Sequence, residues 1–312
     1  MKRRPQGLER VGVTVGSVGV DAGWWLDSAH RLDEAGYHAI WTWDHFVSKG
    51  RNRATPVLEA WSILSAAGAV TERAMLGTFV LNVMNRHPAV LARMAATLQQ
   101  LTAGRVRLGI GIGGHAPEHE AYGMPFPAAP ERAERLEEAI GVLRALFTGG
   151  PVTREGRHYP LADATAFPRA DPAPPILVGA QTLRGVRIAA RSGDGWAAES
   201  HAFEQLVPAY LRAVDEAGRD RRDQLVVVGF GAGRSGVDAL RDSPWIERPR
   251  EELARWQAAG ADEVTITART AWDVDALVDV AAALSSEAAS AASGDSASTD
   301  PRGAASADSG GS

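Results

Sequence analysis

An aspartate and a histidine, Asp44 and His45, stand directly after the apolar and aromatic segment 38–43. If that segment is a strand of a barrel, its end delivers both side chains to the face where such folds place chemistry. A carboxylate beside an imidazole orients the ring and stabilises its protonated form, which suits proton transfer near neutral pH. The pair therefore predicts an acid–base site. The alternative at this stage is a helix-capping aspartate next to a structural histidine.

A second group of titratable residues lies in segment 115–119, which reads His-Ala-Pro-Glu-His. This order matches an inverted zinc-peptidase motif, which requires both histidines on one face of a helix. Pro117 removes a backbone donor between them, and the glycines at 113 and 114 destabilise any preceding turn. We therefore expect a loop that covers the site, and no metal centre.

Two glycine-containing segments follow predicted strands. Residues 109–114 read Gly-Ile-Gly-Ile-Gly-Gly, the pattern of a dinucleotide-binding turn. That turn belongs after a first strand and before a helix, whereas this one follows a fourth strand and precedes a proline. It fits either a backbone that closely approaches a flat ligand or a tight turn. Gly179-Ala180-Gln181-Thr182 precedes an arginine-rich helix and fits either a phosphate cradle or an ordinary connection.

The elements that must position these residues alternate between helices that end near glycine and short β-branched or aromatic strands, which is the α/β signature. Eight strands and eight helices favour a closed (β/α)8 TIM barrel over an open doubly wound sheet. The strands are predicted near residues 11–16, 38–43, 75–81, 105–111, 175–179, 195–198, 224–230 and 263–267, and the helices near 24–35, 56–70, 88–101, 130–147, 182–192, 202–217, 248–259 and 273–284.

The longest interruption of this rhythm is an insertion between strands four and five, at residues 112–174. It lies on the C-terminal side of the barrel, where loops cover substrates. The barrel domain is predicted to span residues 1–284. Residues 285–312 are rich in Ala, Ser, Gly and Asp and carry no periodic pattern, so they are predicted to form a disordered tail.

Composition excludes several classes of function. The net charge of −5 argues against non-specific attraction to nucleic acid or to an anionic membrane. The chain has no cysteine, which excludes disulfides, thiolate nucleophiles and cysteine-bound metals and fits a cytoplasmic location. No apolar run approaches the roughly 20 residues that span a bilayer. Neither a Gly-x-Ser-x-Gly elbow nor a P-loop is present, which counts against hydrolysis and phosphoryl transfer.

Taken together and in order, five segments resemble the luciferase-like monooxygenase superfamily, particularly its coenzyme F420-dependent oxidoreductases. Each segment alone is weakly specific, but five collinear segments across roughly residues 8–200 are strongly specific. They are Glu34–Phe46, Leu76–Thr78 with Arg86–Pro88, Ala103–Gly111, Glu120–Pro127 and Arg191–Trp196.

The resemblance implies that the deazaflavin ring of F420 lies across the C-terminal mouth of the barrel, against Asp44 and His45. It implies hydride transfer between F420 and a small organic substrate, with His45 giving or taking the accompanying proton. It also implies a non-prolyl cis peptide at Phe79–Val80 and a phosphate held by Gly179–Thr182. The residues expected to contact the cofactor are Asp44, Phe79, Val80, Asn82, Gly111, Gly113, Gly179, Ala180, Gln181 and Thr182.

The chain departs from this pattern where many F420 enzymes carry a carboxylate after the strand-four glycines. Gly114 and His115 stand there, so Glu118 is the candidate for the acid–base partner, together with Asp44 and His45. A monooxygenase that uses flavin mononucleotide (FMN) stays open as an alternative, although Asp44-His45 favours F420. A non-catalytic flavin-binding barrel and a metal-dependent hydrolase are further alternatives. The expected partners are a small-molecule substrate, a second copy of the chain in a homodimer, and a flavin or F420 reductase.

Overall fold

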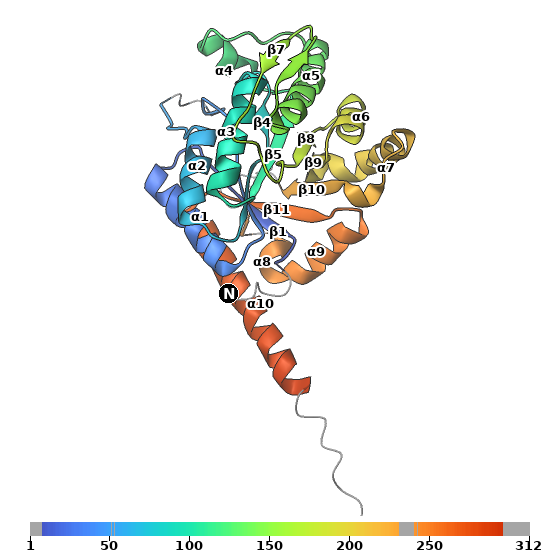
Figure 1. Cartoon of the computed structure of the whole chain (residues 1–312). Coiled ribbons are helices and arrows are strands. Elements are labelled where there is room, and N and C mark those ends of the chain that lie inside the picture. Colours follow the sequence, from blue (N-terminus) through green and yellow to red (C-terminus); the bar gives the residue numbers. More distant parts are fainter. Residues whose placement is uncertain (1–7, 51, 53, 231–239, 242, 296–312) are drawn as a thin grey trace, which may run out of the picture.

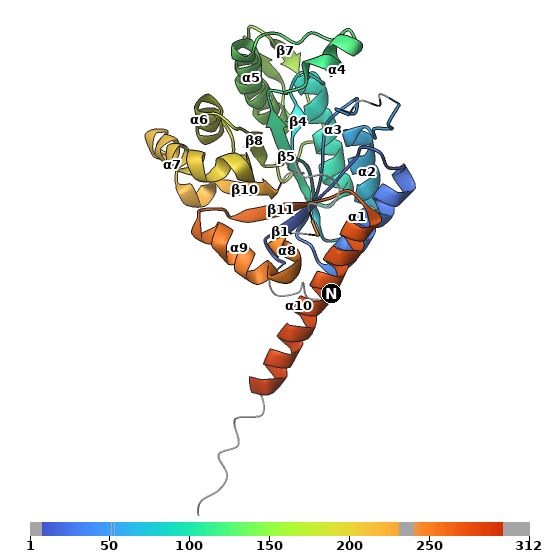
Figure 2. The same cartoon turned by 180° about the vertical axis from the view of Figure 1, so that it is seen from behind.

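The computed structural model describes residues 8–50, 52, 54–230, 240–241 and 243–295. Parallel strands connected by helices close into a barrel, and the helices lie around its outside (Figures 1 and 2). This confirms the predicted (β/α)8 fold. The barrel strands are β1 Val11–Val15, β2 Ala39–Thr42, β3 Met75–Thr78, β4 Leu81–Asn82, β5 Val106–Gly111, β8 Ile176–Gly179, β9 Gly195–Glu199, β10 Leu225–Phe230 and β11 Glu263–Ala268.

The helices follow the predicted rhythm with small shifts at their ends. Asp21 caps the first helix by accepting a 2.8 Å hydrogen bond from the amide of Trp24, and Gly36 ends it in the left-handed conformation that glycine favours. The helices are α1 Ala22–Ala35, α2 Ala60–Val70, α3 Pro88–Leu101, α4 Ala116–Ala121, α5 Ala129–Phe147, α6 Leu183–Ser192, α7 Ser200–Glu216, α8 Pro244–Glu247, α9 Pro249–Ala258 and α10 Ala271–Asp295, with a short 3-10 turn at Arg221–Asp223.

The third barrel position is occupied by two short strands instead of one. β3 pairs with β5 through Leu76 and Val106, and β4 pairs with β5 through Leu81 and Ile110. Between them the Phe79–Val80 peptide bond is cis, as the resemblance implied. The predicted strand 75–81 is therefore wrong as a continuous strand, because its ladder is interrupted at this bulge.

Aromatic side chains fill the inside of the barrel. Trp41 on β2 and Phe79 pack edge to face, with ring centroids 5.8 Å apart. Gly77 on the neighbouring strand leaves room for Trp41, since a Cβ there would collide with the indole ring. The inner cluster is Ala39, Trp41, Phe79, Leu177, Ala197 and Val227. A larger apolar layer lies between the strands and the surrounding helices.

A buried ion pair closes the end of the barrel where the strands begin. Arg107 donates two hydrogen bonds to Glu263, at 2.5 and 3.1 Å, and His38 Nε2 lies 3.1 Å from the same carboxylate. Burial alone would raise the pKa of Glu263, but the hydrogen bond from His38 and the charge of Arg107 outweigh it and lower that pKa to about 2. These groups lie at the opposite end of the strands from Asp44 and His45.

The insertion after β5 forms helices and a hairpin. The predicted loop at 115–119 is wrong, because the short helix α4 begins at Ala116 and places Pro117 in its first turn, where a missing amide donor costs little. α5 follows, as predicted, and then β6 Val152–Arg154 pairs antiparallel with β7 Leu161–Ala164. In Figures 1 and 2 this insertion lies at the upper end of the molecule.

The last helix runs further than expected. α10 continues to Asp295, past residue 284 where the tail was predicted to begin, and its end projects away from the barrel (Figure 1). Alanine-rich sequence has high helix propensity, which the compositional argument for disorder ignored. Residues 296–312 lie outside the described part of the chain.

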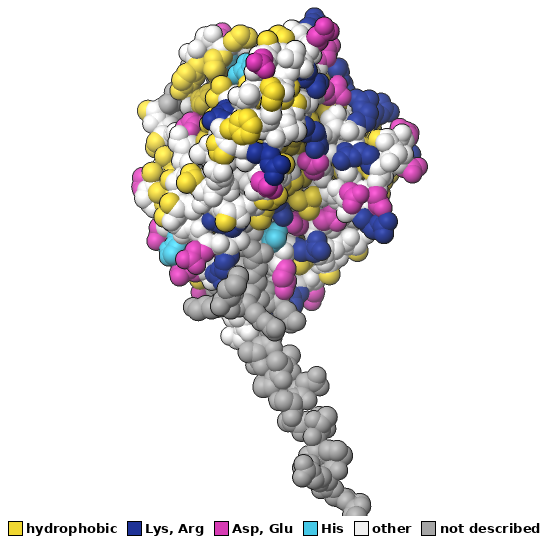
Figure 3. All heavy atoms as spheres, in the orientation of Figure 1, with side chains coloured by type: hydrophobic (Ala, Val, Ile, Leu, Met, Phe, Trp, Pro, Cys, Tyr) yellow, Lys and Arg dark blue, Asp and Glu magenta, His cyan; other side chains and the backbone are white. Residues whose placement is uncertain are grey.

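The surface carries both signs of charge. On the face shown in Figure 3, lysine and arginine side chains are interspersed with aspartate and glutamate. Among the described residues, no helix combines the length and apolar character that crossing a membrane requires.

We expect the Arg107–Glu263 pair to make the free energy of unfolding decrease as the pH falls. The folded-state pKa of Glu263 lies below its ordinary value of 4.5, so its contribution is complete above pH 4.5 and is lost as the pH falls toward about 2. That contribution is roughly 3 kcal/mol. Urea unfolding between pH 7 and pH 3 should show a smaller loss for Glu263→Gln than for the unaltered protein. Glu216→Gln, on the surface of α7, is the matched control, and equal pH dependence in all three proteins would contradict the assignment.

Candidate active site

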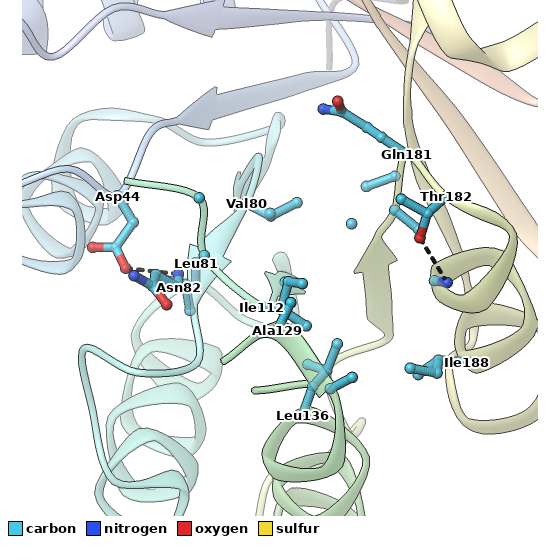
Figure 4. A pocket seen from close by; sticks show the side chains of 18 of the residues that line it. Asp44, Val80, Leu81, Asn82, Ile112, Ala129, Leu136, Gln181, Thr182 and Ile188 are labelled. Atoms are coloured by element: carbon cyan, nitrogen blue, oxygen red, sulfur yellow. Dashed lines mark hydrogen bonds between the residues drawn. The ribbon is translucent and has the colours of Figure 1, made fainter. Parts of the chain in front are cut away.

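A cavity of about 580 Å³ opens where the barrel strands end, within the size range of small-molecule and cofactor sites. It brings together every predicted site residue and adds apolar side chains from α5 and α6. Figure 4 shows Asp44 and Asn82 on one side, Gln181 and Thr182 on the other, and Val80 between them. The predicted residues in the lining are Asp44, His45, Phe79, Val80, Asn82, Gly111, Gly113, Glu118, Gly179, Ala180, Gln181 and Thr182.

Asp44 holds the end of β2 against the loop that follows β4. Its buried carboxylate accepts 3.0 Å hydrogen bonds from the Asn82 amide and from Asn85 Nδ2. It also accepts two from the Arg86 guanidinium, at 2.8 and 3.0 Å. With its oxygens occupied in this way, Asp44 has the contacts of a positioning residue. Its predicted role in proton transfer gains no support from them.

His45 lies against the carboxylate of Glu118. The imidazole Nδ1 is 3.4 Å from both carboxylate oxygens, and the backbone amide of Phe46 donates a 3.0 Å hydrogen bond to one of them. Burial by itself would raise the pKa of Glu118. The hydrogen bonds from His45 and Phe46, together with the charge of His45, outweigh burial and hold that pKa below its ordinary value. The structure thus brings His45 and Glu118 together as a carboxylate–imidazole pair.

The two histidines of segment 115–119 point to different neighbours. The ring of His115 lies 6.2 Å from that of His45, and burial lowers its pKa. His119 is buried, accepts a 2.7 Å hydrogen bond from Asn82 Nδ2 and packs on Phe126. A zinc motif would need both rings to converge on one ion. No cluster of three metal-ligating side chains occurs within the described ranges.

Glycines at the ends of β5 and β8 make room for the bulge at Phe79–Val80. A Cβ on Gly111 would lie 3.0 Å from Val80, and a Cβ on Gly179 would lie 2.6 Å from it. Val80 can therefore sit between β5 and β8 with its side chain in the cavity wall, as Figure 4 shows. Close approach of the bulge accounts for these glycines, an explanation that the sequence alone did not supply. Gly113 has a positive φ of 74°, which accounts for the turn.

The turn after β8 presents polar groups to the cavity at the start of α6. Thr182 caps this helix by accepting a 3.2 Å hydrogen bond from the Gly185 amide. Gln181 and Arg184 lie in the cavity lining beside it. A helix start with exposed amides and a nearby guanidinium favours a negatively charged group. Phosphate binding by this turn stays a prediction, and the arrangement is compatible with it.

Sequence reasoning missed two residues of this site. Arg86, the cation that pairs with Asp44, was quoted only as part of a family segment and given no role. Glu199, the last residue of β9, lies in the cavity lining. Burial raises its pKa, while the charges of His201 and Lys49 act in the opposite direction. Its place at the end of a barrel strand is a signal for function. The predicted strand ended at residue 198, one residue before Glu199, so this signal was missed.

Comparison with known proteins agrees with this geometry. Residues 10–232 match the model of a family described as luciferase-like monooxygenase. The chain belongs to this family.

Within the family, the similar proteins include F420-dependent glucose-6-phosphate dehydrogenases. The protein of that name from Microbacterium testaceum is 37% identical over 64% of this chain and 60% of its own length. The one from Intrasporangium calvum is 38% identical over 64% of this chain and 61% of its own length. The chain thus matches about three fifths of the length of these curated relatives.

A solved structure shares the fold at lower sequence similarity. It is an F420-dependent secondary alcohol dehydrogenase in complex with an F420–acetone adduct, with a TM-score of 0.75 and 21% identity over 89% of this chain and 98% of the other. At this level of identity the likeness supports the barrel fold alone.

We expect Gly179→Ala to destabilise the protein through Val80. The new methyl would overlap the valine side chain, and overpacking of this kind typically costs about 1–3 kcal/mol. In a double-mutant cycle followed by urea unfolding, Val80→Ala should relieve most of the added cost of Gly179→Ala. Gly114→Ala is the control, because a Cβ there meets nothing within 4 Å. Additive effects of the Gly179 and Val80 substitutions would show that the two residues do not constrain each other.

Proposed function

We propose that the protein is an oxidoreductase that transfers a hydride between coenzyme F420 and a small organic substrate. The observation that carries the proposal is the contact of His45 with Glu118 inside the cavity at the strand ends. A carboxylate-held imidazole is the group that such a reaction needs to move the proton that accompanies the hydride. The names of the curated relatives support F420 as the cofactor.

The residues of the cavity fit a cofactor with a flat ring and a phosphate. Val80, Ile112 and Leu136 offer an apolar wall, and Figure 4 shows them directed toward one space. Gln181 and Thr182, at the start of α6, would hold the phosphate. When bound, F420 supplies the carbon that accepts or donates the hydride; it does not readily activate oxygen, which favours dehydrogenase or reductase chemistry over monooxygenation.

His45 would move the proton at its Nε2 atom. Because Nδ1 faces the Glu118 carboxylate, the neutral ring carries its proton there and leaves Nε2 as the acceptor. In the direction of oxidation, Nε2 takes the proton of the substrate hydroxyl. In the direction of reduction, the imidazolium returns it to the carbonyl oxygen. Glu118 stabilises the charged ring in both directions and is itself held by the amide of Phe46.

Two neighbouring groups would keep this pair in place and limit its contact with water. Asp44, bound by Arg86, fixes the end of β2 from which His45 projects. α4 lies beside the site, where Tyr122 packs on Phe46 with ring centroids 5.6 Å apart. Enclosure of this kind strengthens electrostatic interactions within the site.

Several expectations stay predictions at this stage. They are the homodimer, a flavin or F420 reductase as partner, a cytoplasmic location, and the division into a barrel domain at residues 1–284 and a tail at residues 285–312. Light scattering on the purified protein would measure the oligomeric state directly.

We expect His45→Ala to lose hydride transfer and keep cofactor binding. Removing a positioned acid–base group typically slows a reaction by about 10²–10⁴-fold. The decay of F420 absorbance would be followed with 2-propanol, glucose and glucose 6-phosphate as hydride donors. The affinity for F420, measured by fluorescence titration, should change only a few-fold.

The control is His30→Ala, which removes an exposed histidine on α1 and should leave both measurements unchanged. A His45→Ala protein that turns over at the rate of the unaltered enzyme would remove His45 from the mechanism.

A further inference from the structure

The wall of the cavity opposite His45 carries a third carboxyl group, Glu199, besides Asp44 and Glu118. Around the barrel, β2 and β9 are separated by the same number of strands in either direction, so their ends face each other across the mouth. Trp196 packs outward on α7, against Phe203 and Tyr210. Because side chains alternate along a strand, Ala197 and Glu199 share the inner face, and both line the cavity.

Glu199 differs from the other carboxylates of the site in its lack of protein partners. Asp44 is bound by Arg86, and Glu118 accepts from Phe46 and contacts His45. Among the hydrogen bonds and ion pairs of the described residues, none involves the Glu199 side chain. Burial raises its pKa, and the two charged groups that oppose this effect, His201 and Lys49, are not in ion-pair contact with it.

A partly buried carboxyl group without a donor is unfavourable unless a ligand supplies one. Leaving such a group unsatisfied costs free energy of desolvation, and the cost is greater when the group is charged. A site built to bind a hydroxyl or an ammonium group rejects compounds that lack it, because its own polar group is then left unpaired.

We propose that Glu199 determines substrate specificity by accepting a hydrogen bond from a hydroxyl or ammonium group of the substrate, opposite His45. This inference rests on the proposed function for the reaction itself. It names the substrate class as an alcohol or polyol that is uncharged or cationic.

The charges of the lining support this class over phosphorylated substrates. Among the described residues, the cavity lining contains the carboxylates Asp44, Glu118 and Glu199 and one cation, Arg184. Arg86 pairs with Asp44, which leaves Glu118 and Glu199 as the carboxyl groups nearest to the substrate position beside His45. Arg184 lies at the other side, by the turn assigned to the cofactor phosphate, and its guanidinium donates to the Pro130 carbonyl. A phosphate placed beside His45 would be repelled by Glu118 and Glu199, and this repulsion is reduced in part by the charge of Lys49, which acts on Glu199 and His115. The substrate named for the relatives from Microbacterium testaceum and Intrasporangium calvum carries such a phosphate.

Three hexoses of similar shape test the inference: glucose, glucosamine and glucose 6-phosphate. Their binding to the F420-loaded protein would be measured by the change in cofactor fluorescence, and turnover by kcat and KM where it occurs. The variants are Glu199→Gln, which keeps the shape and removes the charge, and Glu199→Ala. Glu120→Gln, an exposed carboxylate on α4, is the matched control.

The unaltered protein should bind glucosamine and glucose at least about tenfold more tightly than glucose 6-phosphate. Glu199→Gln should reduce the ratio of the glucosamine affinity to the glucose 6-phosphate affinity by about tenfold, as expected for the loss of a modest charge interaction. The change should appear in Kd and KM, and kcat should change little. A purely structural role would weaken all three sugars equally. The control should behave as the unaltered protein does.

Preference of the unaltered protein for glucose 6-phosphate, a ratio that Glu199→Gln leaves unchanged, or failure of all three sugars to bind would each overturn the inference. Titration with F420 alone distinguishes failure of the Glu199 assignment from failure of the proposed function. A protein that does not bind F420 contradicts the proposed function, whereas one that binds F420 and shows no charge preference contradicts only the assignment of Glu199.

Discussion

The site depends on one buried interaction, the ion pair of Asp44 with Arg86 together with the hydrogen bonds that Asp44 accepts from Asn82 and Asn85. Asp44 lies two residues after the end of β2, and the backbone amide of Asn82 that it binds belongs to β4, the strand beyond the bulge. One carboxylate therefore fixes two strand ends relative to each other. A buried ion pair of this kind is costly to assemble and still more costly to break, because breaking it leaves an unpaired charge. The direction in which His45 projects follows from that junction.

Three separate chemical environments surround the cavity beside the Asp44–Arg86 ion pair. His45 and Glu118 form a carboxylate–imidazole pair on one wall, while Gln181, Thr182 and Arg184 line another wall at the start of α6. Glu199 faces this pair, and no described residue forms a hydrogen bond or an ion pair with its side chain. Opposite pKa directions for Glu118 and Glu199 arise from this difference, since one carboxylate is hydrogen-bonded and the other is only buried. Under the proposed function, these three environments would serve the proton, the cofactor and the substrate.

The sequence predicted the barrel from local rules, and the family resemblance named residues that the structure brings into one cavity. Apolar periodicity and glycine caps mark the elements, and strand ends converge in this fold whatever their separation in sequence. Non-local contacts were beyond such reasoning. Nothing near Gly179 in the chain reveals that Val80 will pack against it, and the pairing of Asp44 with Arg86 spans 42 positions. α4 was missed because Pro117 was weighed as a helix breaker without its place in the first turn.

The central claim, that this cavity holds F420 beside His45, is tested most directly by titrating the purified protein with F420 and with FMN in each redox state and following fluorescence. We predict saturable binding of one F420 per chain, weakened by changes in the turn at 179–182, and no comparable binding of FMN. Tight binding of FMN, with none of F420, would contradict it and leave only the fold and the family in place.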